Sequence, residues 1–227
     1  LRGYFKTLHN PNTDWCFKTE KEAGLNNREM DFPRGKTLGG SSSINGMLYI
    51  RGQSNDYTYW RQLGNVGWSW EDVLPYFKQS EDNQEGKDNF HGVGGPLKVE
   101  KMRASFKVLD LFTEAAEEFG YLRTSDFNTG NNEGMGYFPL NVKNGYRCST
   151  AVGYLNPIKK RKNLNIFSNS FVEKIIFEGK RAVGIEVKIK NKSEKIYAEK
   201  EIILSGGSIN SPHLLMVSGV GNSDHLK

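Results

Sequence analysis

The sequence predicts a mixed α/β fold, and three patterns lead to this prediction. Residues 105–119 repeat apolar side chains at spacings of three and four, which is typical of an amphipathic helix. Residues 182–190 alternate apolar and polar side chains, which indicates a strand with one solvated face. Residues 201–217 run from a short apolar strand through two glycines into a helix, an order found in nucleotide-binding units.

Composition and charge favour an ordinary globular protein. Of the 227 residues, 37% are hydrophobic and 25% are charged, and both values are near the average. Mean hydropathy is -0.61, and no apolar run approaches the ~20 residues that a membrane span needs. The net charge of +5 is modest, and its one dense cluster, residues 159–162, follows the break at Pro157. We interpret this cluster as a solvated loop, since no nucleic-acid motif accompanies it.

The first hundred residues are expected to be irregular, apart from one helix. Residues 1–32 are polar, with Trp15 as an anchor in an extended stretch. Glu71–Ser80 is predicted to be a helix because Val73, Leu74 and Phe77 share a face. Ser69 can cap this helix at its N-terminus, and Pro75 implies that the helix is short or kinked.

The middle of the chain is predicted to hold one longer helix between two loops. Residues 83–95 and 126–136 are rich in Asn and Gly, which favours loops. Between them, Ser105–Phe119 is the amphipathic helix, and Gly120 is a suitable left-handed terminator.

From residue 164 onward the pattern is predominantly that of strands. The strands that we expect are Asn165–Phe167, Val172–Phe177, Ala182–Lys190, Lys195–Ala198 and Glu201–Leu204. The last of them leads into a helix over Ser211–Val217, with Ser211 as N-cap, Pro212 in the first turn and Gly219 after its end.

A glycine- and serine-rich segment, residues 33–46, is the first candidate for chemistry. The adjacent Gly39 and Gly40 can adopt positive φ and let a backbone approach a ligand closely. Three hydroxyls follow, and then an apolar stretch that can start a helix, whose free amides favour an anion such as a pyrophosphate. It is not a Walker loop, because Lys36 precedes the glycines, and the chain contains no GxGxxG.

A second candidate, residues 205–221, is by itself typical of a capped core helix, but the two segments together carry a family pattern. Residues 34–52 continue through Asp56-Tyr57, Gly67-Trp68 and residues 74–82 in a way that resembles the glucose–methanol–choline (GMC) oxidoreductases. Residues 205–221 match the other hallmark of that family. Residues 46–52 look most like its insect, glucose dehydrogenase-like branch. Thr58 and Gly207 depart slightly from the family pattern.

The resemblance implies an FAD-binding, Rossmann-like domain with part of an antiparallel-sheet substrate domain, both incomplete here. Residues 1–100 would be the flavin-binding segment, 101–160 the substrate-side segment, and 161–227 a β-meander followed by a strand and helix of the nucleotide domain. The residues that would bind FAD are Arg34, Leu38, Gly39, Gly40, Ser41, Ser42, Asn45, Gly46, Met47, Val172, Gly206 and Gly207.

The resemblance also implies the reaction, in which an alcohol or sugar loses hydride to FAD, and oxygen or a quinone-type acceptor then reoxidises the flavin. None of His9, His91, His213 and His225 matches the catalytic histidine of the family, and we interpret His91 as structural. We therefore name no catalytic residue, and no metal site is expected, because Cys16 and Cys148 lack ligand spacing. Those cysteines neither prove nor exclude a disulfide.

Three expectations concern the chain as a whole. It lacks an initiating Met and the first pyrophosphate turn of the family, so we expect an inactive internal fragment of an enzyme. The family resemblance suggests a secreted protein. A non-catalytic flavin- or ligand-binding fragment is the alternative, and the sequences that flank residues 1 and 227 would distinguish the two.

Overall fold

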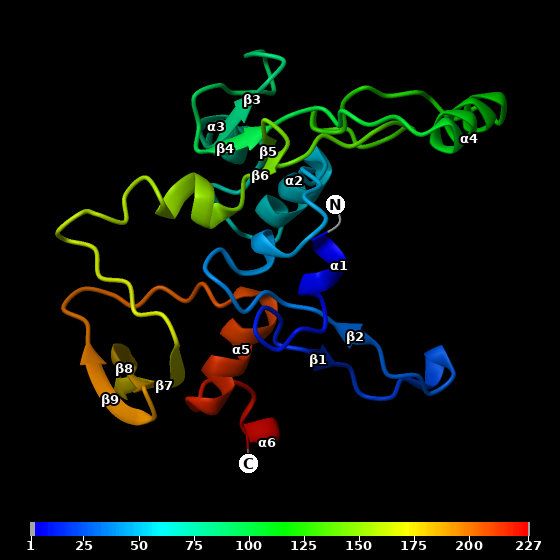
Figure 1. Ribbon diagram of the computed structural model, residues 1–227. Coiled ribbons are helices and arrows are strands. Elements are labelled where there is room, and N and C mark those ends of the chain that lie inside the picture. Colours follow the sequence, from blue (N-terminus) through cyan, green and yellow to red (C-terminus); the bar gives the residue numbers. More distant parts are fainter. Residues whose placement is uncertain (1–2, 227) are drawn as a thin grey trace. The chain divides into compact units, whose positions relative to one another are not determined.

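The computed structural model describes residues 3–226, and it divides into two compact units, residues 1–164 and residues 165–227. Figure 1 shows their elements, and each unit is described here by itself. The predicted mixture of helices and strands is confirmed in both. None of the helices in the described part of the chain has the length and apolar character to cross a membrane.

The first unit is built from short elements joined by long loops. In chain order they are α1 (Tyr4–Thr7), β1 (Phe17–Lys18), η1 (Ala23–Leu25), β2 (Asp31–Phe32), η2 (Gly40–Ser43), α2 (Ser54–Gln62), α3 (Trp70–Ser80), β3 (Glu81–Asn83), β4 (Leu97–Val99), α4 (Lys107–Glu118), β5 (Val142–Lys143), β6 (Tyr146–Arg147) and η3 (Ala151–Leu155). Strands β1 and β2 pair antiparallel, as do β5 and β6, whereas β3 and β4 pair parallel. Its core includes Ile44, Val99 and Phe127.

Helix α3 confirms the prediction of a helix capped by Ser69. The Ser69 hydroxyl accepts from the Asp72 amide at 3.3 Å, and the Asp72 carboxylate accepts from the Ser69 amide at 3.1 Å, which completes a capping box. Pro75 lies inside the helix without ending it. Helix α2 was not predicted, and it packs on α3 through Tyr57, whose ring lies 5.6 Å from that of Phe77.

Helix α4 confirms the predicted amphipathic helix, and Gly120 follows its end with φ of +90°. Its apolar side chains are largely exposed, with Phe112 at 62%, whereas Thr113 is buried. The cluster at residues 159–162 is exposed and lies in a turn and the residues after it, as expected. Both cysteines are free thiols.

The second unit is a three-stranded antiparallel meander followed by two helices. Its strands are β7 (Ser170–Glu178), β8 (Arg181–Ile189) and β9 (Lys192–Tyr197), and its helices are α5 (Gly207–Val217) and α6 (Ser223–Leu226). Ile175 and Val187, both less than 5% exposed, form the core of this unit. Helix α5 contacts β7, and the Ser218 hydroxyl accepts from the Ile175 amide at 2.8 Å.

Three predictions for the second unit are wrong. Residues 165–167 and 201–204 form no strand with any described residue, since a strand needs a neighbour to pair with, and Ile203 is 76% exposed. Helix α5 begins at Gly207, so Ser211 is not its N-cap. The Ser211 hydroxyl instead reaches back to accept from the Gly206 amide at 2.9 Å, which holds an additional turn before Pro212.

Candidate functional site

The glycine–serine segment forms a tight left-handed turn and not the start of an α-helix. Gly39 and Gly40 have φ of +89° and +52°, as the sequence predicted. The turn continues as only four residues of 3-10 helix, Gly40–Ser43. The predicted helix start is wrong because Met47, with φ of +66°, lies in the left-handed region and leaves the helical path.

The glycines of this segment have two different reasons to be glycine. A Cβ on Gly35 would lie 2.2 Å from the Gly40 carbonyl oxygen, and one on Gly39 would lie 2.6 Å from the Ser43 hydroxyl. These two glycines let the segment fold onto itself. In contrast, a Cβ on Gly40 or Gly46 would meet no atom within 4 Å. Those two positions border open space, where a ligand could approach the backbone.

Among the described residues, five backbone amides of the segment find no acceptor, those of Thr37, Leu38, Gly39, Ser41 and Gly46. Gly39 is half-buried, and the other four residues are exposed. Free amides on a left-handed turn are the donors that bind phosphate-like anions. Leu38 of the segment is 55% exposed, and Leu48, two residues after its end, is 52% exposed.

Arg147 and Thr150, to which sequence reasoning assigned no role, hold the turn in shape. The Arg147 guanidinium donates from Nη1 to the Ser42 carbonyl at 3.0 Å and from Nη2 to the Asn45 carbonyl at 2.8 Å. Nη1 also donates to the Asn45 side-chain oxygen at 2.8 Å. The Thr150 amide donates to the Ser42 hydroxyl at 3.0 Å. The side-chain oxygens of Ser42 and Asn45 are therefore engaged within the protein.

Arg34 is held by Asp14, a residue that sequence reasoning missed. The Asp14 carboxylate, 1% exposed, accepts from the backbone amides of Arg34 at 2.9 Å, Cys16 at 3.0 Å and His9 at 2.9 Å. Burial alone would raise the pKa of Asp14, but these donors outweigh it and lower the pKa. The Arg34 guanidinium lies over the Phe32 ring, 4.1 Å from its centroid.

Met47 joins the turn to the rest of the unit in a strained conformation. Its amide donates to the Asn45 side chain at 3.0 Å, and its carbonyl accepts from the Asn141 amide at 2.7 Å. Non-glycine residues with positive φ are uncommon, and they occur often at functional sites. Tyr137 and Phe138, in the loop after α4, both have partners within this unit. Tyr137 donates to Asp110 at 2.7 Å, and the Phe138 ring lies 4.6 Å from that of Phe127.

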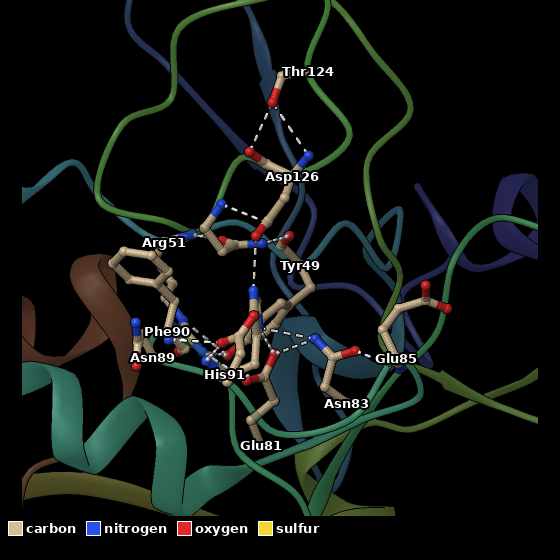
Figure 2. Close-up of polar contacts among 12 residues, drawn as sticks. Tyr49, Arg51, Glu81, Asn83, Glu85, Asn89, Phe90, His91, Thr124 and Asp126 are labelled. Carbon is tan, nitrogen blue, oxygen red and sulfur yellow. Dashed lines mark hydrogen bonds and ion pairs between the residues drawn. The ribbon is translucent and has the colours of Figure 1, made fainter.

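Beyond Met47 the chain enters a buried cluster of charges, shown in Figure 2. The Arg51 guanidinium donates to the Glu81 carboxylate at 2.8 Å, with side chains 1% and 0% exposed. His91 lies between Glu81 at 3.0 Å and Asp126 at 2.8 Å. Hydrogen bonds that the imidazolium donates to Asp126 and, second, to Glu81 raise the pKa of His91 to about 9. This burial and pairing agree with the interpretation of His91 as structural.

The remaining predicted cofactor residues, Val172, Gly206 and Gly207, belong to the second unit. Val172 pairs with Val187, and the ladder then skips Glu173, which makes a bulge beside this predicted FAD contact. Bulges occur often next to binding sites. Gly207 has φ of +89°, and a Cβ there would meet no atom within 4 Å. The predicted residues from Arg34 to Met47 thus all lie in the first unit, and Val172, Gly206 and Gly207 lie in the second.

A sequence profile described as GMC oxidoreductase matches residues 7–226. The chain belongs to the GMC oxidoreductase family. Mitochondrial choline dehydrogenase of Homo sapiens is 42% identical over 94% of this chain and 36% of its own length. Oxygen-dependent choline dehydrogenase of Brucella ovis is 44% identical over 94% of this chain and 39% of its own. The chain thus spans less than two fifths of these relatives.

Solved structures confirm the fold of this GMC chain. Pyridoxine 4-oxidase from Mesorbium loti superposes with a TM-score of 0.92 at 32% identity, over 99% of this chain and 44% of that one. An FAD-dependent oxidoreductase from Chaetomium thermophilum gives a TM-score of 0.89 at 30% identity, over 99% and 42%. The mixed α/β fold of a GMC FAD-binding domain and the cofactor, FAD, are both as predicted from the sequence.

Proposed function

We propose that residues 34–47 of this chain bind FAD, and that the chain provides the flavin side of an alcohol oxidation. The observation that carries the proposal is the set of free amides in this segment, among them those of Gly39, Ser41 and Gly46, beside open space at Gly40. This arrangement fits a flat, anionic cofactor. When bound, FAD supplies the hydride acceptor for oxidation of a CH–OH group.

The residues of the chain have two tasks in this proposal. The free amides bind negative charge on the cofactor, and Leu38 offers it an apolar contact. Arg147 and Thr150 keep the turn from relaxing, so the amides are already in place before the cofactor arrives. Val172, Gly206 and Gly207 are proposed to contact its nucleotide part.

The chain offers no suited proton acceptor among its histidines. His91 is buried and protonated at neutral pH, and it already serves two carboxylates. His9, His213 and His225 are exposed. We therefore propose that residues 1–227 by themselves bind FAD weakly and do not turn over.

The substrate class is proposed to be a small alcohol or a sugar, with oxygen or a quinone-type acceptor. Relatives described as choline dehydrogenases support a small alcohol. The sequence of residues 46–52 favours the glucose dehydrogenase-like branch, and hence a sugar. Secretion is part of the same branch proposal, and glycan on Asn191, in the sequon Asn191-Lys192-Ser193, would support it.

The test is a titration of the chain with FAD, followed by quenching of flavin fluorescence, in two matched variants. Gly40→Ala adds a methyl to the open face of the turn, whereas Gly179→Ala adds one to the β7–β8 turn. Their φ angles, +52° and +59°, impose similar strain. We expect Gly40→Ala to weaken FAD binding about tenfold or more and Gly179→Ala to leave it unchanged. Equal affinity in both variants would contradict the assignment, and alcohol oxidation by the chain alone would contradict the proposed inactivity.

A further inference from the structure

The charged groups around His91 are connected to the backbone that follows residues 34–47, which we call the FAD loop. Arg51 lies just after that loop, Glu81 begins β3, His91 lies between β3 and β4, and Asp126 lies in the loop after α4. In Figure 2 these side chains converge from four separate stretches of the chain. Glu81 also accepts from the Gly92 amide at 3.0 Å, so its carboxylate is fully engaged.

One continuous chain of hydrogen bonds leads from the imidazole to residues 49–51. Asp126 receives His91 Nε2 on Oδ2, and its Oδ1 accepts from the Asn128 amide at 2.8 Å. The buried Asn128 side chain then accepts from the Arg51 amide at 2.8 Å and donates to the Tyr49 carbonyl at 3.3 Å. Asp126 therefore orients Asn128, and the Asn128 side chain holds the Arg51 amide and the Tyr49 carbonyl at the two ends of residues 49–51.

The surroundings of His91 call for a proton on each ring nitrogen. Nδ1 lies 3.0 and 3.1 Å from the two Glu81 oxygens, and Nε2 lies 2.8 Å from Asp126. A neutral imidazole donates only once, so one carboxylate would then face a lone pair. The Asn83 amide nitrogen also lies 2.9 Å from Nδ1, but it has the Glu81 oxygen as an acceptor at 3.2 Å.

The other charged groups near His91 favour the same state. Asp88 accepts from the His91 backbone amide at 2.6 Å, and its charge adds to those of Glu81 and Asp126. Arg51 is the opposing cation, and it is paired with Glu81. With His91 protonated, the charges of Arg51, Glu81, His91 and the partly exposed Asp126 sum to zero; without the proton the group carries one uncompensated negative charge.

We propose that His91, as an imidazolium between Glu81 and Asp126, is a positioning residue that fixes the backbone of residues 49–51 and thereby the shape of the adjoining FAD loop. The link to FAD rests on the proposed function, whereas the link to residues 49–51 stands on the contacts within the chain. Since the pKa of His91 is about 9, the device is complete at neutral pH and is lost in alkaline solution.

The test is a pH titration of the labelled full chain by NMR, which follows the His91 ring and the Arg51 amide together. We expect both signals to change with one midpoint near 9. In Asp126→Asn the side-chain oxygen can still accept from the Asn128 amide, but the neutral side chain no longer stabilises the positive charge of His91. Both midpoints should therefore fall together by about one pH unit or more. Asp82→Asn is the control, because Asp82 pairs with Lys98 and does not contact His91.

A second arm measures FAD affinity over the same pH range and in His91→Gln. Wild-type affinity should fall about tenfold as His91 deprotonates, and His91→Gln should be weaker at pH 7 and insensitive to this change. An Arg51 amide that stays constant while the His91 ring titrates would overturn the proposal, as would unchanged midpoints in Asp126→Asn. If the wild-type chain binds no FAD at any pH, the proposed function fails, and the NMR arm still decides the role of His91.

Discussion

Removing the Arg51 guanidinium should destabilise the first unit more than any surface substitution. Arg51 is only 4% exposed, and its partner Glu81 is fully buried. In Arg51→Met, Glu81 keeps His91 and the Gly92 amide, but the Phe90 carbonyl loses its donor at 2.7 Å. Breaking a buried ion pair by removing one partner costs about 3–5 kcal/mol, because the remaining charge is not hydrated. We expect a loss of unfolding free energy in this range.

The assay is urea unfolding followed by tryptophan fluorescence, since all four tryptophans lie before residue 71 and report on the first unit. The matched control is Arg123→Met, whose partner is Glu117 at 3.4 Å and whose pair is exposed, with side chains 56% and 40% exposed. That pair should contribute about 1 kcal/mol or less. A loss in Arg51→Met no greater than in Arg123→Met would refute the reasoning that burial decides the magnitude.

Three further predictions follow from single features of the fold. The pKa of His91 rises from 6.5 to about 9 on folding, so its stabilisation is complete below pH 6.5 and is lost as the pH rises through 9; unfolding free energy should fall by up to ~3 kcal/mol over that range, measured by urea unfolding at each pH. Ser69→Ala removes the N-cap of α3 and should cost about 1 kcal/mol in the same unfolding assay, and Gln79→Ala, at an exposed position inside the same helix, is the control. Gly35→Ala forces the turn away from the Gly40 carbonyl and should expose the turn to proteolysis; an unchanged cleavage pattern would contradict the close approach.

The sequence predicted elements whose signals are local. Helix α3 has its cap at Ser69, and β8 has an unbroken alternation from residue 182. Residues 201–204 carry a similar apolar signal but find no partner strand among the described residues, and local patterns contain no information about partners. Helix α2 was missed because its apolar signal is short: within Ser54–Gln62 only Tyr57 and Trp60 share a face at a helical spacing.

The candidate site likewise combines features with a local sequence signal and features that depend on distant partners. The left-handed glycines could be predicted because their type restricts the backbone, whereas Arg147 acts on Asn45 across 102 residues of sequence. Asp14, 20 residues before Arg34, carried no signal either, because a single aspartate in a polar stretch is usually solvated. Contacts of this kind form only when the fold brings distant residues together, so a local sequence motif identifies one partner and not the other.

The glycines of the FAD loop meet two different requirements, the packing of the turn against itself and the access of a ligand to the free amides, and the sequence motif does not distinguish them. Gly35 and Gly39 are needed because the turn packs against itself, so a side chain there acts on folding whether or not a cofactor is present. Gly40 and Gly46 border open space, so a side chain there acts chiefly on what approaches the free amides. The loop is therefore shaped by its own packing and by Arg147 before any ligand binds. Its amides remain unpaired because that packing leaves them no acceptor, which is the condition that suits them to an anionic cofactor.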